Sequence, residues 1–518
     1  MPPTLSPVES ELASPFGVNR LALAPAVVMP SPAATPGSAT EQLSDAEAWR
    51  REVVDAYERR GARKPSPLTN YCQRRIRERV ARIVEPGARV LEIGCGEGDL
   101  LAALRPCVGV GVDLRERAVL EARRRHPGFR FTRMAGEEVD RLGDTFDYVV
   151  ISQTLGEIHD LRALLRAVQW VCHSRTRVVI VHYSRVWQPA LKLMEWLRIN
   201  PPSPQQNWVP PDETIHLLKL NDFETVNRFG MTLAPLYVPF LSNMLNRLVG
   251  NLPGLHHLGL NYVIVARCVA PRLIERNEPR SVSIVIPARN EAGHIEPLLK
   301  RIPRLAPRQE IIFVEGGSSD GSWDVIRRAV AGYDGPFNVK AIRQTGRGRG
   351  DAVRAGFAAA VGEVLMILDA DISVPPEELP AFYEALANGR GEFINGSRMV
   401  YLTDRRAMRF SNLLANKLFG WLFTYLLFQR FRDTLCGTKV LTRSDYERIA
   451  ANRAYFGEFD PFGDFDLLFG AAKLNLKITD MPVHYKGCSF GETNRSRFRH
   501  GWMLLKMCLF AARKIRFV

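Results

Sequence analysis

The sequence lacks the patterns of a disulfide-stapled or zinc-bound protein. Its eight cysteines are scattered, without a CxxC pair and without the His–Cys spacing of a metal site. Several of them lie in apolar stretches typical of strands and helices, and this distribution fits reduced thiols in a cytosolic protein. We therefore expect neither a disulfide framework nor a structural zinc ion.

Long apolar runs are also missing. The densest one, LFGWLFTYLLF at 418–428, is well short of the ~18 uninterrupted apolar residues of a membrane span. The apolar stretch at 21–29 is broken by Pro25 and preceded only by Arg20, which argues against a secretion signal. Residues 1–45, rich in Pro, Ala and Ser, are expected to form a disordered tail. A soluble or peripheral protein is predicted.

Negative charge is in deficit. The chain of 518 residues contains 70 Lys and Arg against 55 Asp and Glu, a formal net charge of +15. This excess indicates an anionic partner, which could be a membrane surface, a phosphorylated substrate or nucleic acid. Arginines spread over solvated faces explain the charge equally well. At about 150 residues per domain, the length predicts two to four domains.

A first domain is predicted at 46–270, where strands alternate with helices. RVLEIGCGEGDLLAAL at 89–104 is typical of a strand, a glycine turn and a helix, and VGVGVDL at 108–114 of the next strand. Such alternation predicts a doubly wound parallel sheet, with ligands bound beyond the carboxyl ends of its strands.

The glycine turn indicates a nucleoside cofactor. Gly94, Gly96 and Gly98 let the backbone approach a ligand closely, while Asp99 stands where the GxGxxG motif of NAD and FAD proteins requires glycine. Asp113, at the end of the second strand, can accept hydrogen bonds from two ribose hydroxyls.

Three motifs together resemble the class I S-adenosylmethionine-dependent methyltransferases, over roughly residues 70–270: EIGCGEG, VGVGVDL and FDYVVISQTLGEIHDL. The resemblance implies a site for S-adenosylmethionine (SAM). Its methionine half would contact Glu92, Gly94, Gly96 and Gly98. Asp113 would bind the ribose, Glu137 would lie near the adenine, and Ser152 with Gln153 would face the methyl sulfonium. Glu137 as a solvated loop acid and Gln153 as a helix cap stay open.

The sequence does not single out a catalytic base for methyl transfer. His159, His182 and Tyr183 follow strand ends and are candidates, but a single histidine there is more often a structural hydrogen-bonding group. Residues 190–260 interrupt the alternation with proline-rich and aromatic stretches, which predict either a lid over the site or an ornamented sheet edge.

A linker at 271–280 separates this domain from a second one at 281–518. Three strand-helix units follow one another, beginning at SVSIVIPARNE, EIIFVEGG and GEVLMILDADIS. The predicted fold class is therefore α/β, with two domains that each contain a mostly parallel sheet. Asp369 and Asp371 lie where the third of these strands ends, and the pair can hold Mg²⁺ or Mn²⁺ while leaving positions for diphosphate oxygens.

Five segments of this domain, in order, resemble the family-two glycosyltransferases of the GT-A fold, particularly the dolichol-phosphate mannosyltransferase-like branch: VSIVIPARNE, FVEGGSSDGSWDVI, GRGRGDAVRAGF, LDADIS and DTLCGTKVLTRSDYERI. The resemblance implies a nucleotide-sugar donor bound by Pro287, Asn290, Glu291, Glu315, Asp320, Arg349 and Asp369. Asp369 and Asp371 would hold the metal and diphosphate. Gly316 stands where the family usually has a second acid, which leaves the donor nucleotide undecided. Arg347 and Arg349 could pair with phosphate oxygens, because the arginine fork suits bidentate contact, or they could belong to a flexible glycine-rich surface loop.

The acceptor side is expected near FGDFDLLF, where Asp464 or Asp466 would act as the catalytic base for a hydroxyl acceptor. A structural acid paired with arginines is the alternative. Arg495 and Arg497 would close over phosphate. The pattern of the last helix predicts a basic, amphipathic helix that lies on an anionic membrane. The apolar segment ANKLFGWLFTYLLFQRF is expected either in the lipid interface or in the protein core.

The predicted function is a bifunctional transferase. A metal-dependent, inverting glycosyltransferase would use a lipid-phosphate or glycan acceptor, and a SAM-dependent methyltransferase would precede it in the chain. The alternative is an active glycosyltransferase with a degenerate, accessory methyltransferase-like domain. A processive synthase is disfavoured because no QxxRW motif is present. Nucleic acid is not expected as a partner, and the expected location is cytoplasmic, at the inner face of the membrane.

Overall fold

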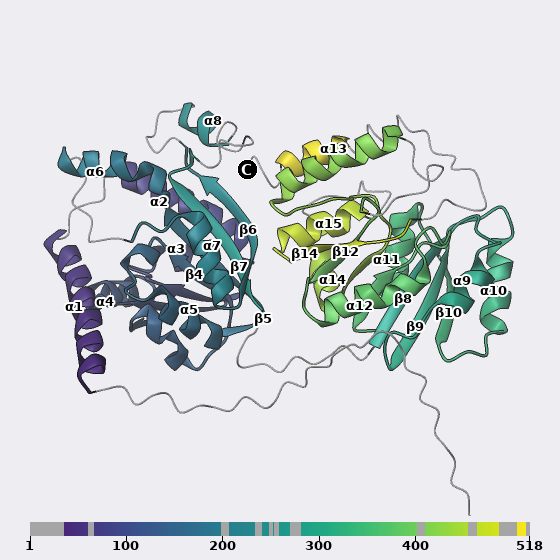
Figure 1. The fold of residues 1–518 in the computed structure, drawn as a ribbon, viewed down its shortest axis with the longest axis horizontal. Helices are drawn as coiled ribbons and strands as arrows, with labels where there is room; N and C mark the ends of the chain where they lie inside the picture. Colours follow the sequence, from purple (N-terminus) through teal and green to yellow (C-terminus); the bar gives the residue numbers. More distant parts are fainter. Residues whose placement is uncertain are drawn as a thin grey trace, which may run out of the picture. The chain divides into compact units, whose positions relative to one another are not determined.

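The structure is a computed structural model that describes residues 36–60, 67–197, 207–233, 241–247, 252, 258–269, 281–400, 410–453, 464–485 and 505–513. The chain divides into two compact units, Met1–Arg51 and Glu52–Val518, and both sheets of the protein lie in the second unit (Figure 1).

The first sheet and its helices come from the elements before residue 270. In chain order these are α1 (Pro36–Arg60), α2 (Pro67–Ile83), β1 (Arg89–Ile93), α3 (Asp99–Leu104), β2 (Val108–Asp113), α4 (Glu116–Arg125), β3 (Arg130–Arg133), η1 (Gly136–Leu142), β4 (Phe146–Ser152), η2 (Leu155–Glu157), α5 (Leu161–Trp170), β5 (Cys172–Tyr183), η3 (Arg185–Trp187), α6 (Gln188–Trp196), α7 (Pro211–Leu220), β6 (Phe223–Met231), α8 (Leu241–Arg247) and β7 (Asn261–Cys268).

Seven strands form this sheet in the order β3-β2-β1-β4-β5-β7-β6. The first five run parallel, and β7 is antiparallel to both β5 and β6. Strand order reverses between β1 and β4, and in a doubly wound sheet the crevice at this reversal binds ligands. The glycine turn after β1 lies at that crevice.

Two apolar cores cover the two faces of the first sheet. Neighbouring residues of β1 alternate between them, because successive side chains of a strand point to opposite faces. Val90 packs with α2, α3 and α4 on one face, and Leu91 packs with α5, α7 and η1 on the other. Burial on both faces explains why β1, β2 and β4 are almost continuously apolar.

The second sheet and its helices come from the elements after residue 280. They are β8 (Ser281–Ala288), α9 (Ile295–Arg301), β9 (Arg308–Glu315), α10 (Ser322–Ala331), β10 (Asn338–Arg343), α11 (Arg349–Ala359), β11 (Val364–Ile367), η6 (Pro376–Glu378), α12 (Leu379–Ala387), β12 (Phe393–Ser397), α13 (Phe410–Leu427), β13 (Lys439–Thr442), α14 (Arg443–Ala451), α15 (Asp464–Lys473) and β14 (Ile478–Pro482).

The order of this sheet is β10-β9-β8-β11-β13-β12-β14. Only β13 is antiparallel to its neighbours, so β12 and β14 run in the same direction as β8, β9 and β11. One core packs α9, α10 and α12 against one face, and another packs α11, α13, α14 and α15 against the other. The two sheets confirm the α/β fold class that the sequence predicts.

Helix α1 begins at Pro36, inside the segment expected to be disordered, because the helical pattern from residue 46 extends backward through good helix formers such as Ala and Glu. The seven cysteines that the structure describes are all free. Among the described residues no helix combines enough length with enough apolar character to cross a membrane.

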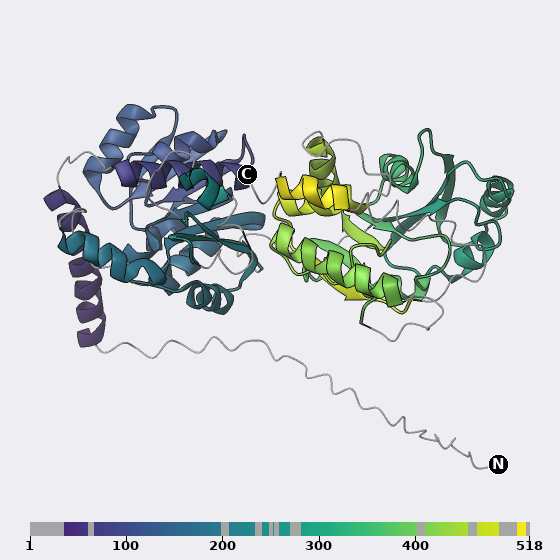
Figure 2. The same ribbon diagram turned by 90° about the horizontal axis from the view of Figure 1, so that it is seen from above.

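Helix α13 lies close to the short helix at 505–511 (Figure 2), and the two share one core. Each also has exposed apolar residues. Phe423 and Leu426 are fully buried, whereas Leu418 and Trp421 are 60% and 58% exposed. In the C-terminal helix Met507 is buried, and Leu509 is 57% exposed. The sequence left core and lipid interface as alternatives for α13, and the structure shows one face in the core and another exposed.

Candidate functional sites at the ends of the two sheets

The glycine turn after β1 requires glycine for conformational and steric reasons. Gly94, Gly96 and Gly98 all have left-handed φ values, of 75°, 54° and 81°. A Cβ atom on Gly94 would also meet the hydroxyl oxygen of Thr154 at 2.0 Å. The turn therefore places bare backbone at the carboxyl end of β1, where a ligand can approach it.

Asp113, at the end of β2, is hydrogen-bonded on both carboxylate oxygens. Oδ2 accepts from Gly96 N at 2.8 Å and from Arg115 Nη2 at 2.9 Å, and Oδ1 accepts from Arg115 N and Nε at 2.9 Å each. The Arg115 guanidinium also lies 4.1 Å from the centre of the Tyr57 ring. Asp113 thus lies beside the glycine turn, as a ribose-binding carboxylate would, but its oxygens already have partners.

The other predicted cofactor residues lie at the same edge of the sheet. Glu92 is buried, its carboxylate accepts from Leu101 N at 2.9 Å in the first turn of α3, and burial raises its pKa well above the usual value. Ser152 ends β4, and Gln153 after it has a left-handed φ of 59°. Glu137 is the second residue of η1 and is half-buried. Glu92 therefore supports the helix that follows the turn.

His182 has the structural role that sequence reasoning favoured for a single histidine. The ring is buried against Tyr262, and Nε2 donates to the carbonyl oxygen of Asn207 at 3.3 Å. Burial lowers the pKa of His182 to about 4. His159 is exposed. A neutral, buried imidazole with so low a pKa is a weak base, so the structure gives no support for His182 as the proton acceptor.

In the second sheet, the loops after β8 and β9 are tied together at the carboxyl ends of their strands. Asn290 adopts a left-handed φ of 59°, and its side-chain oxygen accepts from Ser319 N at 2.9 Å. Asp320 accepts from Ala292 N at 3.2 Å and from Ser322 N at 2.9 Å. These bonds fix the turn after Pro287 against the serine-rich loop, so both loops present a rigid edge.

The first acid of the D-x-D pair is held by an arginine. Arg349, at the start of α11, donates from Nε to Asp369 Oδ1 at 2.9 Å and from Nη2 to the carbonyl oxygen of Gly437 at 2.9 Å. A Cβ atom on Gly437 would lie 1.8 Å from Asp369 Oδ2. Arg349 and Gly437 therefore position Asp369, whereas Arg347 of the same loop is exposed.

The second acid, Asp371, faces a more negative environment. Burial and then repulsion from Asp369 raise its pKa above the usual value, although Ser373 N donates to Oδ1 at 3.0 Å. Glu291, bonded to His294 Nδ1 at 2.7 Å, has a pKa raised by burial and further by the charge of Asp371. The loop after β8 and the pair after β11 thus bring three carboxylates to one edge.

This donor set fits a hard divalent cation. Because the charge of Asp369 raises the pKa of Asp371, a cation between the two carboxylates would be favourable, and oxygen ligands are what Mg²⁺ and Mn²⁺ prefer. No cluster of three or more His, Cys, Asp or Glu with metal-binding geometry occurs in the part of the chain that the structure describes. A cation at Asp369 and Asp371 would therefore take its other ligands from water and from diphosphate.

Glu315, at the end of β9, is buried and held in place. It accepts from Ser318 N at 2.5 Å, and Arg343 Nε lies 3.7 Å from its Oε2. The guanidinium of Arg343 stacks over the Trp323 ring, 4.4 Å from its centre. Where the family usually has a second acid, Gly316 donates its backbone N–H to Ala288 O at 2.9 Å. Gly316 thus continues the backbone pairing of β8 and β9 beyond the ends of the two strands.

Family models match both halves of the chain. Residues 68–227 match the model described as Methyltransferase domain, and residues 283–450 match Glycosyl transferase family 2. The chain thus joins a methyltransferase-like domain to a domain that is similar to the family 2 glycosyltransferases. The two matches cover the two sheets and the loops described above.

Curated relatives match the glycosyltransferase domain. The chain is 38% identical over 112 residues to undecaprenyl-phosphate 4-deoxy-4-formamido-L-arabinose transferase of Aeromonas hydrophila, covering 21% of this chain and 34% of that protein. It is 37% identical over 122 residues to dolichol-phosphate mannosyltransferase of Pyrococcus furiosus, covering 23% and 33%. The matches span about a third of the length of these relatives.

Solved structures resemble each domain. Glucosyl-3-phosphoglycerate synthase of Mycobacterium tuberculosis, in complex with Mn²⁺ and uridine diphosphate, is 18% identical with a TM-score of 0.33, covering 46% of this chain and 80% of that one. Magnesium protoporphyrin IX methyltransferase of Synechocystis, with bound S-adenosylhomocysteine, is 16% identical with a TM-score of 0.30, covering 44% and 99%.

The acceptor side of the glycosyltransferase domain is described in part. Asp466 is buried, and its Oδ2 accepts from Arg453 Nε at 2.8 Å, which is the structural pairing that the sequence left open. Asp464 begins α15, but its side chain lies outside the described residues, as do Arg495 and Arg497. Asp466 is thus engaged by an arginine, and a base role for Asp464 stays a prediction.

Sequence reasoning missed a buried pair in the glycosyltransferase domain. Arg398, which follows β12, donates from Nε to Asp433 Oδ2 at 2.7 Å and from Nη2 to Oδ1 at 2.9 Å. Its guanidinium lies 5.1 Å from the centre of the Tyr485 ring, and the charges of Asp371 and Asp369 act on Tyr485. The available signal in the sequence was the DTLCGTK segment. It contains Asp433, and four residues later it contains Gly437, which lies against Asp369.

Proposed function

We propose that the glycosyltransferase domain transfers a sugar from a nucleotide-sugar to a lipid-phosphate or glycan acceptor, with a divalent cation at Asp369 and Asp371. The main support is the convergence of Glu291, Asp369 and Asp371 at the carboxyl edge of adjacent strands β8 and β11. The relatives named as lipid-phosphate sugar transferases support the acceptor class. Pro287, Asn290, Glu315, Asp320 and Arg349 complete the proposed donor site.

The proposed reaction is an inverting single displacement at the anomeric carbon. A bound Mg²⁺ or Mn²⁺ would neutralise charge on the departing nucleoside diphosphate. Arg349 keeps the Asp369 carboxylate oriented, and Asp371 is half-buried beside it. A lipid-phosphate acceptor is already ionised and needs no base, whereas a hydroxyl acceptor would need one, for which Asp464 is the candidate.

Replacement of Asp371 by alanine tests this function. Mn²⁺-dependent hydrolysis or transfer is measured across a panel of UDP- and GDP-sugars. We expect wild type to turn over at least one donor, and Asp371→Ala to lose about 100-fold or more of that activity, because a group acting on transition-state charge is removed.

Asp334→Ala serves as the matched control, since Asp334 is exposed in the loop between α10 and β10. It should retain wild-type activity. Full activity in Asp371→Ala would contradict the metal site.

We also propose that the methyltransferase domain binds SAM and transfers its methyl group. The supporting observation is the position of Asp113 beside the left-handed glycine turn, with Gly96 N bonded to its Oδ2. SAM would supply an electrophilic methyl group, and the chain would supply the backbone of Gly94, Gly96 and Gly98 together with the carboxylate of Asp113. Glu137 and Ser152 would complete the pocket.

One observation favours the alternative of an accessory methyltransferase domain. Arg115 forms a two-pronged ion pair with Asp113, so a ribose diol would have to displace these bonds. A domain that keeps the fold while its arginine occupies the ribose position would stabilise the chain without catalysis. The two functions predict different binding of SAM.

Calorimetry with SAM separates them. An active domain should bind SAM, and Asp113→Ala should weaken that binding by roughly 10- to 100-fold, the effect of losing hydrogen bonds to a charged group. Asp144→Ala is the control, because Asp144 precedes β4 at the opposite edge of the sheet and pairs with Arg89. If wild type binds no SAM, the accessory function stands and methyl transfer is refuted.

A further inference from the structure

A buried carboxylate links the two domains of the second unit. Glu392, directly before β12, accepts from both sides of its carboxylate: Arg177 Nη2 lies 2.8 Å from Oε1 and 2.7 Å from Oε2, and Lys477 N lies 2.8 Å from Oε2. Arg177 belongs to β5, and its side chain is only 3% exposed. Burial alone would raise the pKa of Glu392, but attraction to Arg177 and Arg267 outweighs it and the net shift is downward.

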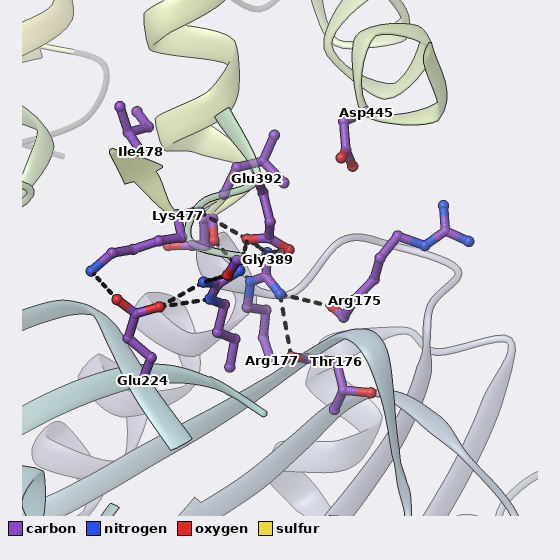
Figure 3. Close-up of polar contacts among 12 residues, drawn as sticks. Arg175, Thr176, Arg177, Glu224, Gly389, Glu392, Asp445, Lys477 and Ile478 are labelled. Atoms are coloured by element: carbon purple, nitrogen blue, oxygen red, sulfur yellow. Dashed lines mark hydrogen bonds and ion pairs between the residues drawn. The ribbon is translucent and has the colours of Figure 1, made fainter. Parts of the chain in front are cut away.

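Both arginines of this contact bond to each domain. Arg177 also donates from Nε to the carbonyl oxygen of Asn475 at 2.8 Å, and from Nη1 to the carbonyl oxygen of Arg175 in its own domain at 3.0 Å. Arg267, on β7, donates from Nη2 to Glu224 Oε2 at 2.6 Å and to the carbonyl oxygen of Gly389 at 2.7 Å. Figure 3 shows Arg177 pointing from its strand to Glu392. The two buried guanidinium groups therefore find acceptors on both sides of the contact.

Neutral and charged groups extend the contact along both sheets. Lys477 Nζ lies 2.9 Å from Glu224 Oε1, and Asn227 Nδ2 donates to Asn475 Oδ1 at 2.6 Å (Figure 3 shows Lys477 and Glu224). We call the whole set the seam: Arg177, Glu224, Asn227, Arg267, Glu392, Asn475 and Lys477. Its members come from β5, β6 and β7 of the methyltransferase domain and from the starts of β12 and β14 of the glycosyltransferase domain.

Further contacts link the same domains through the end of helix α2 and through strand β6. Glu85, just after α2, pairs with Arg448 of α14 at 2.5 Å, and Lys473 of α15 donates to the carbonyl oxygen of Arg82 at 3.1 Å. The rings of Phe229 and Phe428 lie 4.8 Å apart. These contacts add apolar and charged groups to those of the seam.

The seam lies at the edge of each sheet that is opposite to its candidate site. Arg177 lies in the middle of the long strand β5 and pairs with Tyr148 near the start of β4, while the glycine turn follows the end of β1, which runs parallel to β4 and β5. Glu392 precedes β12, which runs in the same direction as β11, and Asp369 follows the end of β11. A substitution in the seam therefore changes neither candidate site directly.

We propose that the methyltransferase and glycosyltransferase domains bind each other through the seam, and that they form a single folded body that does not depend on the chain between them. The surface around Glu392 is then an interaction surface whose partner is the basic end of β5 and β7.

The physical reason is desolvation. A guanidinium that is almost fully buried loses its hydration, and it is stable only where acceptors replace the lost water. Because the acceptors of Arg177 and Arg267 include groups of the other domain, separation would leave these groups without partners until water entered. Two independent domains joined by a linker would gain nothing from burying these charges.

Cleavage of the connecting chain tests the proposal. A protease site is introduced within residues 271–280 of the full-length protein, the chain is cut, and the products are run on a size-exclusion column at micromolar concentration. We expect the wild-type fragments to co-elute. Glu392→Gln removes the charge but keeps the shape, and it should weaken fragment association by roughly 10- to 100-fold.

The matched control is Glu377→Gln, which makes the same change in an exposed ion pair with Arg301. It should leave co-elution unchanged. Separation of the wild-type fragments, or equal association in both variants and wild type, would overturn the seam as a binding surface.

Hydrogen exchange of the uncut chain gives a second readout that does not need fragments. In Glu392→Gln, amides at the starts of β5, β12 and β14 should exchange faster, while β1 and β8 in the two sheet centres stay protected. Equal protection of the strand starts in wild type and Glu392→Gln would contradict the proposal. If β1 and β8 also lost protection, the seam would be a determinant of folding and not an association surface, and that result would overturn it too.

Discussion

At the residue scale, the donor site depends on three residues from distant parts of the chain. Asp369 receives its hydrogen bonds from Arg349, and Arg349 also bonds to the carbonyl oxygen of Gly437. From the motifs, Arg349 was expected to bind phosphate and Asp369 to bind a metal ion, because a guanidinium suits phosphate and a carboxylate suits a cation. The structure shows that the two side chains also bond to each other, and that the arginine orients the carboxylate. Gly437 is the residue that leaves room for this contact.

Gly437→Ala should therefore damage the donor site without unfolding the domain. Its Cβ would lie 1.8 Å from Asp369 Oδ2, so the carboxylate must rotate away from its present position. We expect donor turnover to fall by about 100-fold, as a displacement of about 1 Å can cost that much. Circular dichroism should show a folded protein.

Gly332→Ala is the matched control, since its Cβ would meet only Arg328 O at an ordinary 3.4 Å. Wild-type turnover in both variants would contradict the close packing of Asp369 against Gly437.

At the element scale, α13 and the helix at 505–511 show how one apolar pattern serves two environments. An almost completely apolar sequence cannot tell which side faces the core, and the expected membrane contact rested on aromatic content and basic residues. Packing decides that Phe423 and Met507 face inward. Trp421 and Leu509 stay exposed, and the exposed Lys506 and Arg513 stand three and four residues from Leu509 along the chain. We propose that this apolar and basic side contacts an anionic lipid surface at the inner face of the membrane.

Vesicle sedimentation tests this contact. Trp421→Gln and Leu509→Gln should each weaken binding to vesicles that contain anionic lipid, by about tenfold, since each removes one large apolar side chain from the interface. Val361→Gln, at a position that is 71% exposed next to β11, should bind as wild type does. Equal binding by all three variants would refute the proposed membrane surface.

At the scale of the whole molecule, both sheets were readable from local patterns. The glycine turn and the apolar strands predicted the first sheet, and the strand-helix units predicted the second, since burial of parallel strands on both faces leaves continuous apolar runs. The antiparallel strands β7 and β13 were not predicted as such, because strand direction depends on where the chain returns. The contact of Arg177 with Glu392, 215 residues away, carried no local signal at all.

The sequence alone determined the two α/β domains, the glycine turn before Asp113 and the D-x-D pair at a strand end, because backbone conformation, burial and ligand chemistry are set by residue type and spacing. Only the tertiary structure decided which carboxylate each of three arginines binds: Arg115 hydrogen-bonds to Asp113, Arg453 to Asp466 and Arg177 to Glu392. The partner of a charged side chain depends on which desolvated groups the fold brings within hydrogen-bonding distance, and long-range packing alone fixes that choice.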